Sequence, residues 1–197
     1  MSGFARLFEF FGMMNSVADR QMSCKRLILP KTRCHDLLAL ASTLPWERGR
    51  LNHIDANARE LRACDSCFVY PDARSAWLFD WLQVAFVGAG AALGVSVGRI
   101  LEAPQIVRYH CGDFFDWHQD SVDDTGARAL TASIQLSAPE DYEGGSLELK
   151  SGEHSSHKIG AVTVFRAEDW HRVNPILIGT RVALVAWIDH VDFNSKL

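Results

Sequence analysis

The residues of this chain best suited to chemistry are two histidines and an aspartate. His118 and Asp120 stand two positions apart at the end of the stretch YHCGDFFDWHQD, and His171 follows later in the chain. On an extended strand alternate side chains point to one face, so this imidazole and this carboxylate would project together. A second imidazole from His171 would complete the facial triad that holds non-haem Fe(II) and leaves positions open for substrate and oxygen. We therefore expect the iron-binding, catalytic centre of an oxygenase.

An arginine and a tyrosine suit the binding of an acidic co-substrate beside such a metal. Arg181 follows His171 by ten residues, far enough for a hairpin to return it to the same pocket. Arginine pairs a carboxylate through a planar fork and does not lose its charge. Tyr109 can add a hydrogen bond from its hydroxyl. We expect these two side chains to bind a dicarboxylate.

The remaining histidines lack partners at the spacing of metal ligands. His110 is expected to point to the opposite face of its strand from Tyr109, and two more histidines stand in a polar turn. We therefore place none of the following on iron: His35, His53, His110, His154, His157 and His190.

The composition is that of an ordinary globular protein. The chain has 197 residues, of which 48% are hydrophobic and 22% charged, and its net charge is −4. This length fits a single domain with a hydrophobic core, so we assign residues 1–197 to one domain. Basic runs and basic stripes interleaved with aromatic residues do not occur in the sequence, which disfavours a nucleic-acid partner.

The cysteines indicate a reducing compartment. Five cysteines is an odd number in a chain too long to need disulfides, which predicts free thiols and a cytoplasmic location. Cys64 and Cys67 form a CxxC motif, but a zinc site would need a second pair, and a redox role would need a thioredoxin-like setting. We interpret them as two semi-buried thiols. The apolar segment Phe4–Met14 is interrupted by charges, which favours a short amphipathic segment over a signal peptide.

Two helices are predicted in the first half of the chain. Residues 32 to 44 have helical spacing, and Pro45 ends this helix. Asp72 can cap a longer helix that begins near Ala73, with apolar side chains on one face. The apolar run Trp77–Val97 contains polar residues and glycines, so we expect a buried helix and no membrane partner.

The rest of the chain is typical of short strands. Alternation of apolar and polar residues is clearest in residues 129–137. Strands are expected at 25–30, 67–70, 105–109, 114–120, 129–137, 146–150, 161–165, 170–173 and 181–188. We interpret 45–66, 121–128 and 138–145 as loops at the rim of a pocket. Such strand spacing favours a sandwich or a jelly-roll barrel, with the helices packed on one face.

Four stretches together resemble a known family. They are VRYHCGDFFDWHQD, LTASIQLSAPEDYEGGSLEL, AVTVF and WHRVNPILIGTRVALVAWI. In this order, and with the EGG turn, they resemble the 2-oxoglutarate- and Fe(II)-dependent dioxygenases, within these the prolyl 4-hydroxylase-like branch and its bacterial PKHD-type hydroxylases. The resemblance covers residues 101 to 190 closely and extends loosely to the helix around Trp77.

The resemblance implies a mostly β fold with flanking helices. The core would be a double-stranded β-helix, or jelly roll, over about residues 99–190, with helical support over about 1–98 packed on one sheet. It implies a metal site made of His118, Asp120 and His171. By position it implies Arg181 as the partner of the distal carboxylate of 2-oxoglutarate, with Tyr109 donating a hydrogen bond nearby. The family often carries tyrosine where Phe115 stands, so that hydroxyl is absent here.

The implied activity is hydroxylation of an unactivated C–H bond, in a prolyl or other amino-acid side chain. Fe(II) is the cofactor, 2-oxoglutarate and dioxygen are co-substrates, succinate and CO2 are released, and ascorbate is a candidate stimulant. The substrate would be a peptide, a protein or an amino-acid-like molecule. The alternatives are a hydroxylase of a small free metabolite and a non-catalytic sensor that binds metal and 2-oxoglutarate. A zinc hydrolase with the same ligands would lack an obvious general base.

Overall fold

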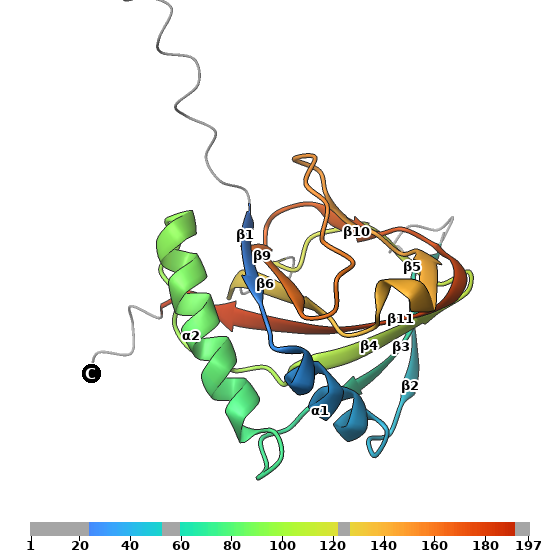
Figure 1. Ribbon diagram of the computed structural model, residues 1–197. Coiled ribbons are helices and arrows are strands. Elements are labelled where there is room, and N and C mark those ends of the chain that lie inside the picture. Colours follow the sequence, from blue (N-terminus) through green and yellow to red (C-terminus); the bar gives the residue numbers. More distant parts are fainter. Residues whose placement is uncertain (1–23, 53–59, 122–126, 192–197) are drawn as a thin grey trace, which may run out of the picture.

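The structure, a computed structural model, describes residues 24–52, 60–121 and 127–191 (Figure 1). Within these residues the helices are α1 (Lys31–Ala41) and α2 (Ala76–Leu93), with a short 3-10 helix η1 (Pro139–Asp141). The strands are β1 (Cys24–Ile28), β2 (Glu47–Asn52), β3 (Glu60–Phe68), β4 (Gln105–His110), β5 (Phe114–His118), β6 (Arg128–Gln135), β7 (Tyr142–Gly144), β8 (Leu147–Leu149), β9 (Ala161–Arg166), β10 (His171–Val173) and β11 (Ile176–Asp189). The N-terminal segment Phe4–Met14 lies outside the described residues.

The strands form one curled antiparallel sheet. Its order is β1-β9-β6-β11-β4-β3-β5-β10-β8, with β2 added beside β3 and β7 beside β11. The sheet curls so that the short strands β5 and β10 lie over the long strands β4 and β11 (Figure 1). This arrangement confirms the predicted mostly β, jelly-roll fold with helices packed on one side.

The long strands separate a core from a pocket. On β4, β6 and β11 one set of alternate side chains, including Ile106, Ile134 and Leu184, is fully buried together with side chains of α2. The intervening side chains face the inside of the curl. Because successive side chains of a strand point to opposite faces, the core behind the sheet determines which residues face the pocket.

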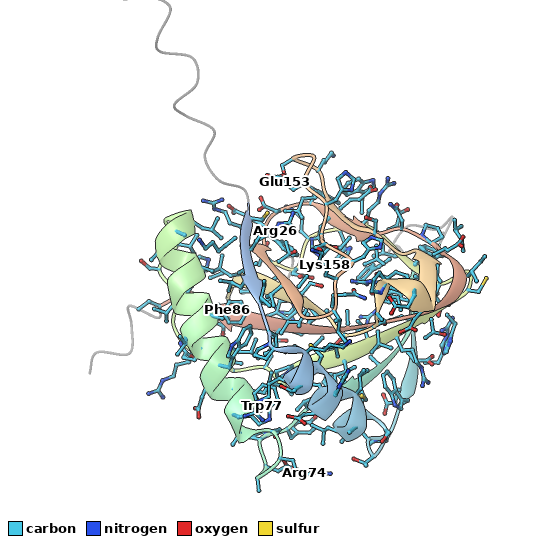
Figure 2. The ribbon with its side chains drawn as sticks, viewed as in Figure 1. Arg26, Arg74, Trp77, Phe86, Glu153 and Lys158 are labelled. Atoms are coloured by element: carbon cyan, nitrogen blue, oxygen red, sulfur yellow. The ribbon has the colours of Figure 1, made fainter. Side chains whose placement is uncertain are left out.

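The apolar helix α2 belongs to this core. By length and composition it could cross a membrane. However, Leu78, Leu82 and Phe86 are fully buried with the strands of the sheet. Figure 2 shows Phe86 on the side of α2 that faces the strands, and Trp77 near the start of the helix. Core packing therefore accounts for one face of α2, whereas Val84 and Val87 on the other side are exposed.

The first half of the chain contributes more β structure than the sequence predicted. The edge strand β1 is confirmed, but residues 45–66, interpreted above as a rim loop, include the hairpin of β2 and β3. These strands are polar because their charges are paired across the outer face. Asp65 lies 2.8 Å from Arg108 and 3.3 Å from Arg48. Cross-strand ion pairs stabilise a strand that hydrophobic alternation alone does not reveal.

Three boundaries also differ from the prediction. Residues 138–145 are not a simple loop, because η1 is followed by β7, which pairs with β11. The helix α1 ends at Ala41, before the predicted stop. Asp72 accepts hydrogen bonds from the backbone N–H groups of Arg74 and Ser75, and so caps the turn before α2, which begins at Ala76.

Two glycines allow β7 to lie close to β11. Gly144 and Gly145 have φ angles of +80° and +60°, the left-handed region that other residues rarely adopt. A Cβ atom at Gly144 would lie 2.3 Å from the carbonyl oxygen of Pro175, and one at Gly145 would lie 3.0 Å from Cδ of Arg181. Gly144 therefore allows close approach to the backbone of Pro175, and Gly145 leaves space for the side chain of Arg181.

We predict that Gly144→Ala lowers the free energy of unfolding by about 1–3 kcal/mol, because a side chain in this conformation is strained and also meets backbone. Urea denaturation would measure the change. The control is Gly88→Ala on the exposed side of α2, where a Cβ meets nothing within 4 Å. Gly88→Ala should raise the free energy of unfolding by about 0.5–1 kcal/mol. Equal effects of the two substitutions would contradict this account.

Candidate active site

The three predicted metal ligands meet inside the curl of the sheet. His118 ends β5, His171 begins β10, and the two are direct partners in the antiparallel pair. Strand β5 is shorter than predicted, so Asp120 lies just beyond it. Its backbone N–H donates to the carbonyl of Ala167 at 2.8 Å, which holds the residue beside both histidines.

The distances fit a single ion between these side chains. Oδ1 of Asp120 lies 3.7 Å from Nε2 of His118, and Oδ2 lies 3.6 Å from Nε2 of His171. The three ligand atoms all lie within 4.8 Å of one another, and His171 is only 4% exposed. Two imidazole nitrogens and one carboxylate oxygen on one side are a donor set that suits Fe(II) and leaves positions open.

Both imidazoles are oriented by backbone carbonyls. Nδ1 of His118 lies 2.8 Å from the carbonyl of Asp116, and Nδ1 of His171 lies 2.9 Å from that of Asp169. A carbonyl can only accept, so each Nδ1 carries the proton and each Nε2 offers a lone pair. Burial, with a contribution from His171, lowers the pKa of His118 to about 4. The ring of His118 is therefore neutral at pH 7, the state that binds metal.

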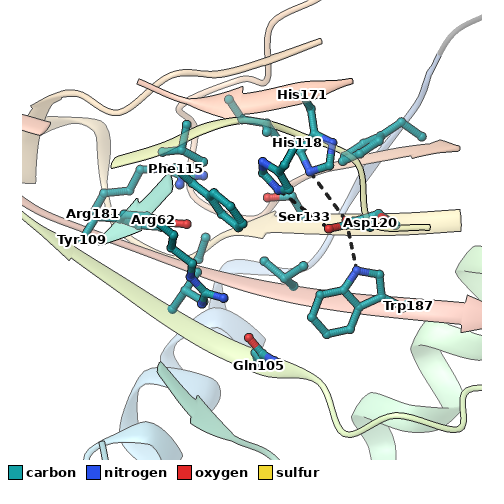
Figure 3. A pocket seen from close by; sticks show the side chains of 17 residues that line it. Arg62, Gln105, Tyr109, Phe115, His118, Asp120, Ser133, His171, Arg181 and Trp187 are labelled. Carbon is teal, nitrogen blue, oxygen red and sulfur yellow. Dashed lines mark hydrogen bonds and ion pairs between the residues drawn. The ribbon is translucent and has the colours of Figure 1, made fainter. Parts of the chain in front are cut away.

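The carboxylate is fixed through one of its two oxygens. Oδ2 of Asp120 accepts a hydrogen bond from the hydroxyl of Thr131 at 2.7 Å. It also accepts one from the indole N–H of Trp187 at 3.0 Å (Figure 3). Burial alone would raise the pKa of Asp120, but the two neighbouring imidazoles and these two donors hold it below its usual value. The aspartate is therefore ionised, with Oδ1 left available to a metal.

Arg181 and Tyr109, the residues predicted to bind the co-substrate, also lie in this pocket. They are direct partners on β11 and β4, and each is 3% exposed. Nε of Arg181 donates to the side-chain oxygen of Gln135 at 3.1 Å. Burial raises the pKa of Tyr109, whose hydroxyl has no hydrogen-bond partner among the described residues. A buried guanidinium beside an unpartnered hydroxyl fits one end of a dicarboxylate such as 2-oxoglutarate.

The pocket is lined by alternate residues of the long strands. The empty space between its walls is about 490 Å3, a volume that includes open solvent at the mouth. The lining comprises Arg181, Ala183, Val185 and Trp187 of β11, Gln105, Val107 and Tyr109 of β4, and Thr131 and Ser133 of β6, faced by residues of β3, β5, β8, β9 and β10.

Several site residues were absent from the sequence-based prediction. Trp187 could have been found, because it follows Arg181 by an even number of residues and so lies on the same face of the strand. The same alternation applies to Thr131. No pattern pointed to Arg62, because the segment that contains it was interpreted as a loop. The ring of Phe115, where the family often has tyrosine, stacks on His118 at 3.4 Å between centroids.

Other histidines in the described residues lie away from this centre. His110 is exposed and contacts Thr180 and Asp65, and His154 lies 3.5 Å from Glu148. His157 stacks on the ring of Tyr142. His53 lies outside the described residues. The exclusion of His110, His154 and His157 as metal ligands agrees with the geometry.

The CxxC cysteines pack in separate places. Both thiols are free and buried, but Cys64 belongs to the cluster that includes Tyr109, and Cys67 to the core with α2. Since the two side chains leave β3 in opposite directions, they do not form a redox pair in this structure. Burial raises the pKa of Cys67 to about 11, as expected of an inert thiol.

Comparisons with known proteins agree with this site. Residues 104–189 match the family model of the 2OG-Fe(II) oxygenase superfamily. A PKHD-type hydroxylase of Synechococcus sp. strain CC9605 is 28% identical over 177 residues, which cover 79% of this chain and 73% of that protein. Matches to other PKHD-type hydroxylases are shorter and span 28% to 54% of their lengths.

Solved structures share the fold at lower identity. A prolyl-4-hydroxylase of Pseudomonas putida superposes with a TM-score of 0.65 at 19% identity, covering 86% of this chain and 94% of that one. A prolyl hydroxylase of Trichoplax adhaerens, solved with a peptide fragment of the hypoxia inducible factor oxygen degradation domain, has a TM-score of 0.65 at 17% identity. That match covers 85% of this chain and 84% of that one.

The chain is therefore an oxygenase that uses Fe(II) and 2-oxoglutarate, and its residues 104–189 resemble the 2OG-Fe(II) oxygenase superfamily. Within that superfamily it is similar to the PKHD-type hydroxylases. The family, the iron cofactor and the 2-oxoglutarate co-substrate that the motifs predicted are confirmed.

We predict that Trp187→Phe weakens the binding of Fe(II) or Mn(II) by about 10–100-fold, because a hydrogen bond that orients a metal ligand is lost. Anaerobic titration calorimetry would measure the affinity. Thr131→Val removes the other donor with little change of shape and should act in the same direction. The control is Trp77→Phe on α2, where the indole packs under Arg33. Unaltered metal affinity in both pocket variants would show that Asp120 does not need these bonds.

Proposed function

We propose that this enzyme hydroxylates an unactivated C–H bond of a prolyl or other amino-acid side chain, with His118, Asp120 and His171 as its iron ligands. Arg181 and Tyr109 would bind 2-oxoglutarate. The observation that carries the proposal is the set of three ligands in one buried pocket with Arg181 and the unpartnered hydroxyl of Tyr109. The similarity to PKHD-type hydroxylases supports the reaction type.

The protein's own residues would position the reactants. With iron and 2-oxoglutarate bound, the centre supplies oxygen activation coupled to oxidative decarboxylation, so that one oxygen atom enters the substrate and the other enters succinate, with release of CO2. Arg181 and Tyr109 would hold the distal carboxylate in its buried end of the pocket. Thr131 and Trp187 keep the Asp120 carboxylate in a single orientation. The apolar walls, such as Val107 and Leu147, exclude water from the reacting atoms.

A peptide is one candidate form of the substrate, since the Trichoplax adhaerens relative was solved with one. A free amino acid is the other. A cytoplasmic location is part of the proposal and is supported by the free state of all five cysteines, which are all described.

We expect purified protein with Fe(II), 2-oxoglutarate, ascorbate and oxygen to release succinate, and candidate substrates to increase the rate. His118→Ala should abolish both metal binding and succinate release, because two ligands hold the ion poorly. Mass spectrometry of succinate would follow the reaction. Metal-dependent binding of 2-oxoglutarate without any succinate, under all these conditions, would instead support the sensor alternative.

We predict that Arg181→Ala weakens the binding of 2-oxoglutarate by about 30-fold or more, because loss of one partner of a buried charge pair costs about 2–5 kcal/mol. Calorimetry in the presence of Mn(II) without oxygen would measure the dissociation constant. The matched control is Arg33→Gln, an exposed arginine of α1 paired with Asp36. Normal affinity in Arg181→Ala would show that this arginine does not bind the co-substrate.

A further inference from the structure

The pocket contains a second arginine that the co-substrate does not require. Arg62 of β3 is partly buried and lines the same pocket as the metal ligands. Its guanidinium is turned toward the space bordered by Phe115, Gln105 and Trp187 (Figure 3). A cation in this position can be stabilised by the protein, by water or by a ligand.

The protein holds Arg62 by one edge only. Its Nε donates to Sγ of Cys64 at 2.9 Å, and its guanidinium carbon lies 5.1 Å from the centroid of the Phe115 ring. Within the described part of the chain the side chain has no salt bridge, and its two terminal amino groups have no hydrogen-bond partner. The thiol of Cys64 and the ring of Phe115 therefore fix the orientation of the guanidinium and leave its two terminal amino groups available to a ligand.

A second polar group in this part of the pocket is also unpartnered. Gln105 lines the pocket from β4, and its side-chain amide has no hydrogen bond to any described residue. Both side chains are only partly buried, and polar groups that lose contact with water without gaining partners cost free energy. A ligand that supplies acceptors to the guanidinium and the amide together would remove this cost.

We propose that Arg62 binds a carboxylate of the substrate, so that the molecule oxidised by this enzyme is an α-amino acid with a free carboxylate, either as a free amino acid or at the carboxy terminus of a peptide. The planar fork of arginine matches a carboxylate through two parallel hydrogen bonds. The inference rests on the proposed function, because it names the substrate class of that same site.

The position of Arg62 favours substrate over co-substrate. Arg181 is 3% exposed and lies beside Tyr109 and Gln135, which provides the buried end suited to 2-oxoglutarate. Arg62 is more exposed, and so lies nearer to the opening of the pocket. Arg62 also contacts the ring of Phe115, which stacks on His118. A carboxylate bound to Arg62 would therefore be separated from this metal ligand by a single side chain. The C–H bonds of a small amino acid would then face the metal centre.

The test compares acids with their amides. Succinate release is measured with a mixture of the twenty common L-amino acids and with a mixture of the corresponding amino-acid amides. A second pair of arms uses N-acetylated pentapeptides with free or amidated carboxy termini. We expect the wild-type protein to release succinate about tenfold or more faster with one set of acids than with the matching amides. Whether this set is the free amino acids or the peptides identifies the source of the carboxylate.

In Arg62→Gln the ratio of succinate release with the acid to that with the amide should fall to about one. Arg62→Lys should restore part of this preference, because lysine keeps the positive charge but lacks the planar guanidinium. Arg33→Gln is the control. For the acid identified, calorimetry without oxygen, with Mn(II) and 2-oxoglutarate present, should show the same loss in Arg62→Gln. Equal turnover of acids and amides, stimulation by neither, or a preference retained in Arg62→Gln would each overturn the proposal.

Two outcomes separate this proposal from others. If Arg62→Gln raises the KM for 2-oxoglutarate as much as the KM for the acid, then Arg62 belongs to the co-substrate site and the inference is wrong. If the wild-type protein neither binds nor consumes 2-oxoglutarate, then the proposed function itself fails. The basal succinate release of the wild-type protein distinguishes these two failures.

Discussion

The two-residue period of the antiparallel strands is the constraint on which the rest of this structure depends. On β4, β6 and β11 one set of alternate side chains, such as Ile106 and Leu184, forms the core with α2, and the other set, such as Thr131 and Arg181, lines the pocket. A slip of one residue in any of these strands would exchange the two sets. Because burial of the apolar set resists such a slip, the hydrophobic core indirectly aligns the charged and hydroxyl groups that face the metal centre.

The parts of the site that follow local rules could be predicted from the sequence. Residue type and spacing, together with the family resemblance, pointed to His118, Asp120, His171, Arg181 and Tyr109, and the structure brings these side chains into one pocket. The hairpin of β2 and β3 was not found, because its stability depends on ion pairs with partners far along the chain, such as Arg48 with Asp113. Contributions that depend on such distant contacts are not encoded in a local pattern, and the same reason explains why Arg62 was not predicted.

The charge of the pocket differs from that of the whole protein. The chain carries a net charge of −4, yet the described residues that line the pocket include two guanidinium groups, Arg62 and Arg181, and one carboxylate, Asp120. An excess of positive charge in a concave site with apolar walls concentrates ligands of negative charge. The pocket therefore favours small anions over the neutral and cationic molecules that surround it, before any specific contact is made.

The hydrogen bonds of Asp120 have a consequence for the barrel as a whole. Its carboxylate is tied to Thr131 on β6 and Trp187 on β11, while the two imidazoles belong to β5 and β10 on the opposite wall. An ion shared by these three side chains would join the two walls as a cross-link. A metal that binds only the folded chain stabilises it by an amount that grows with the free metal concentration. The resistance of this fold to heat would therefore follow the supply of iron.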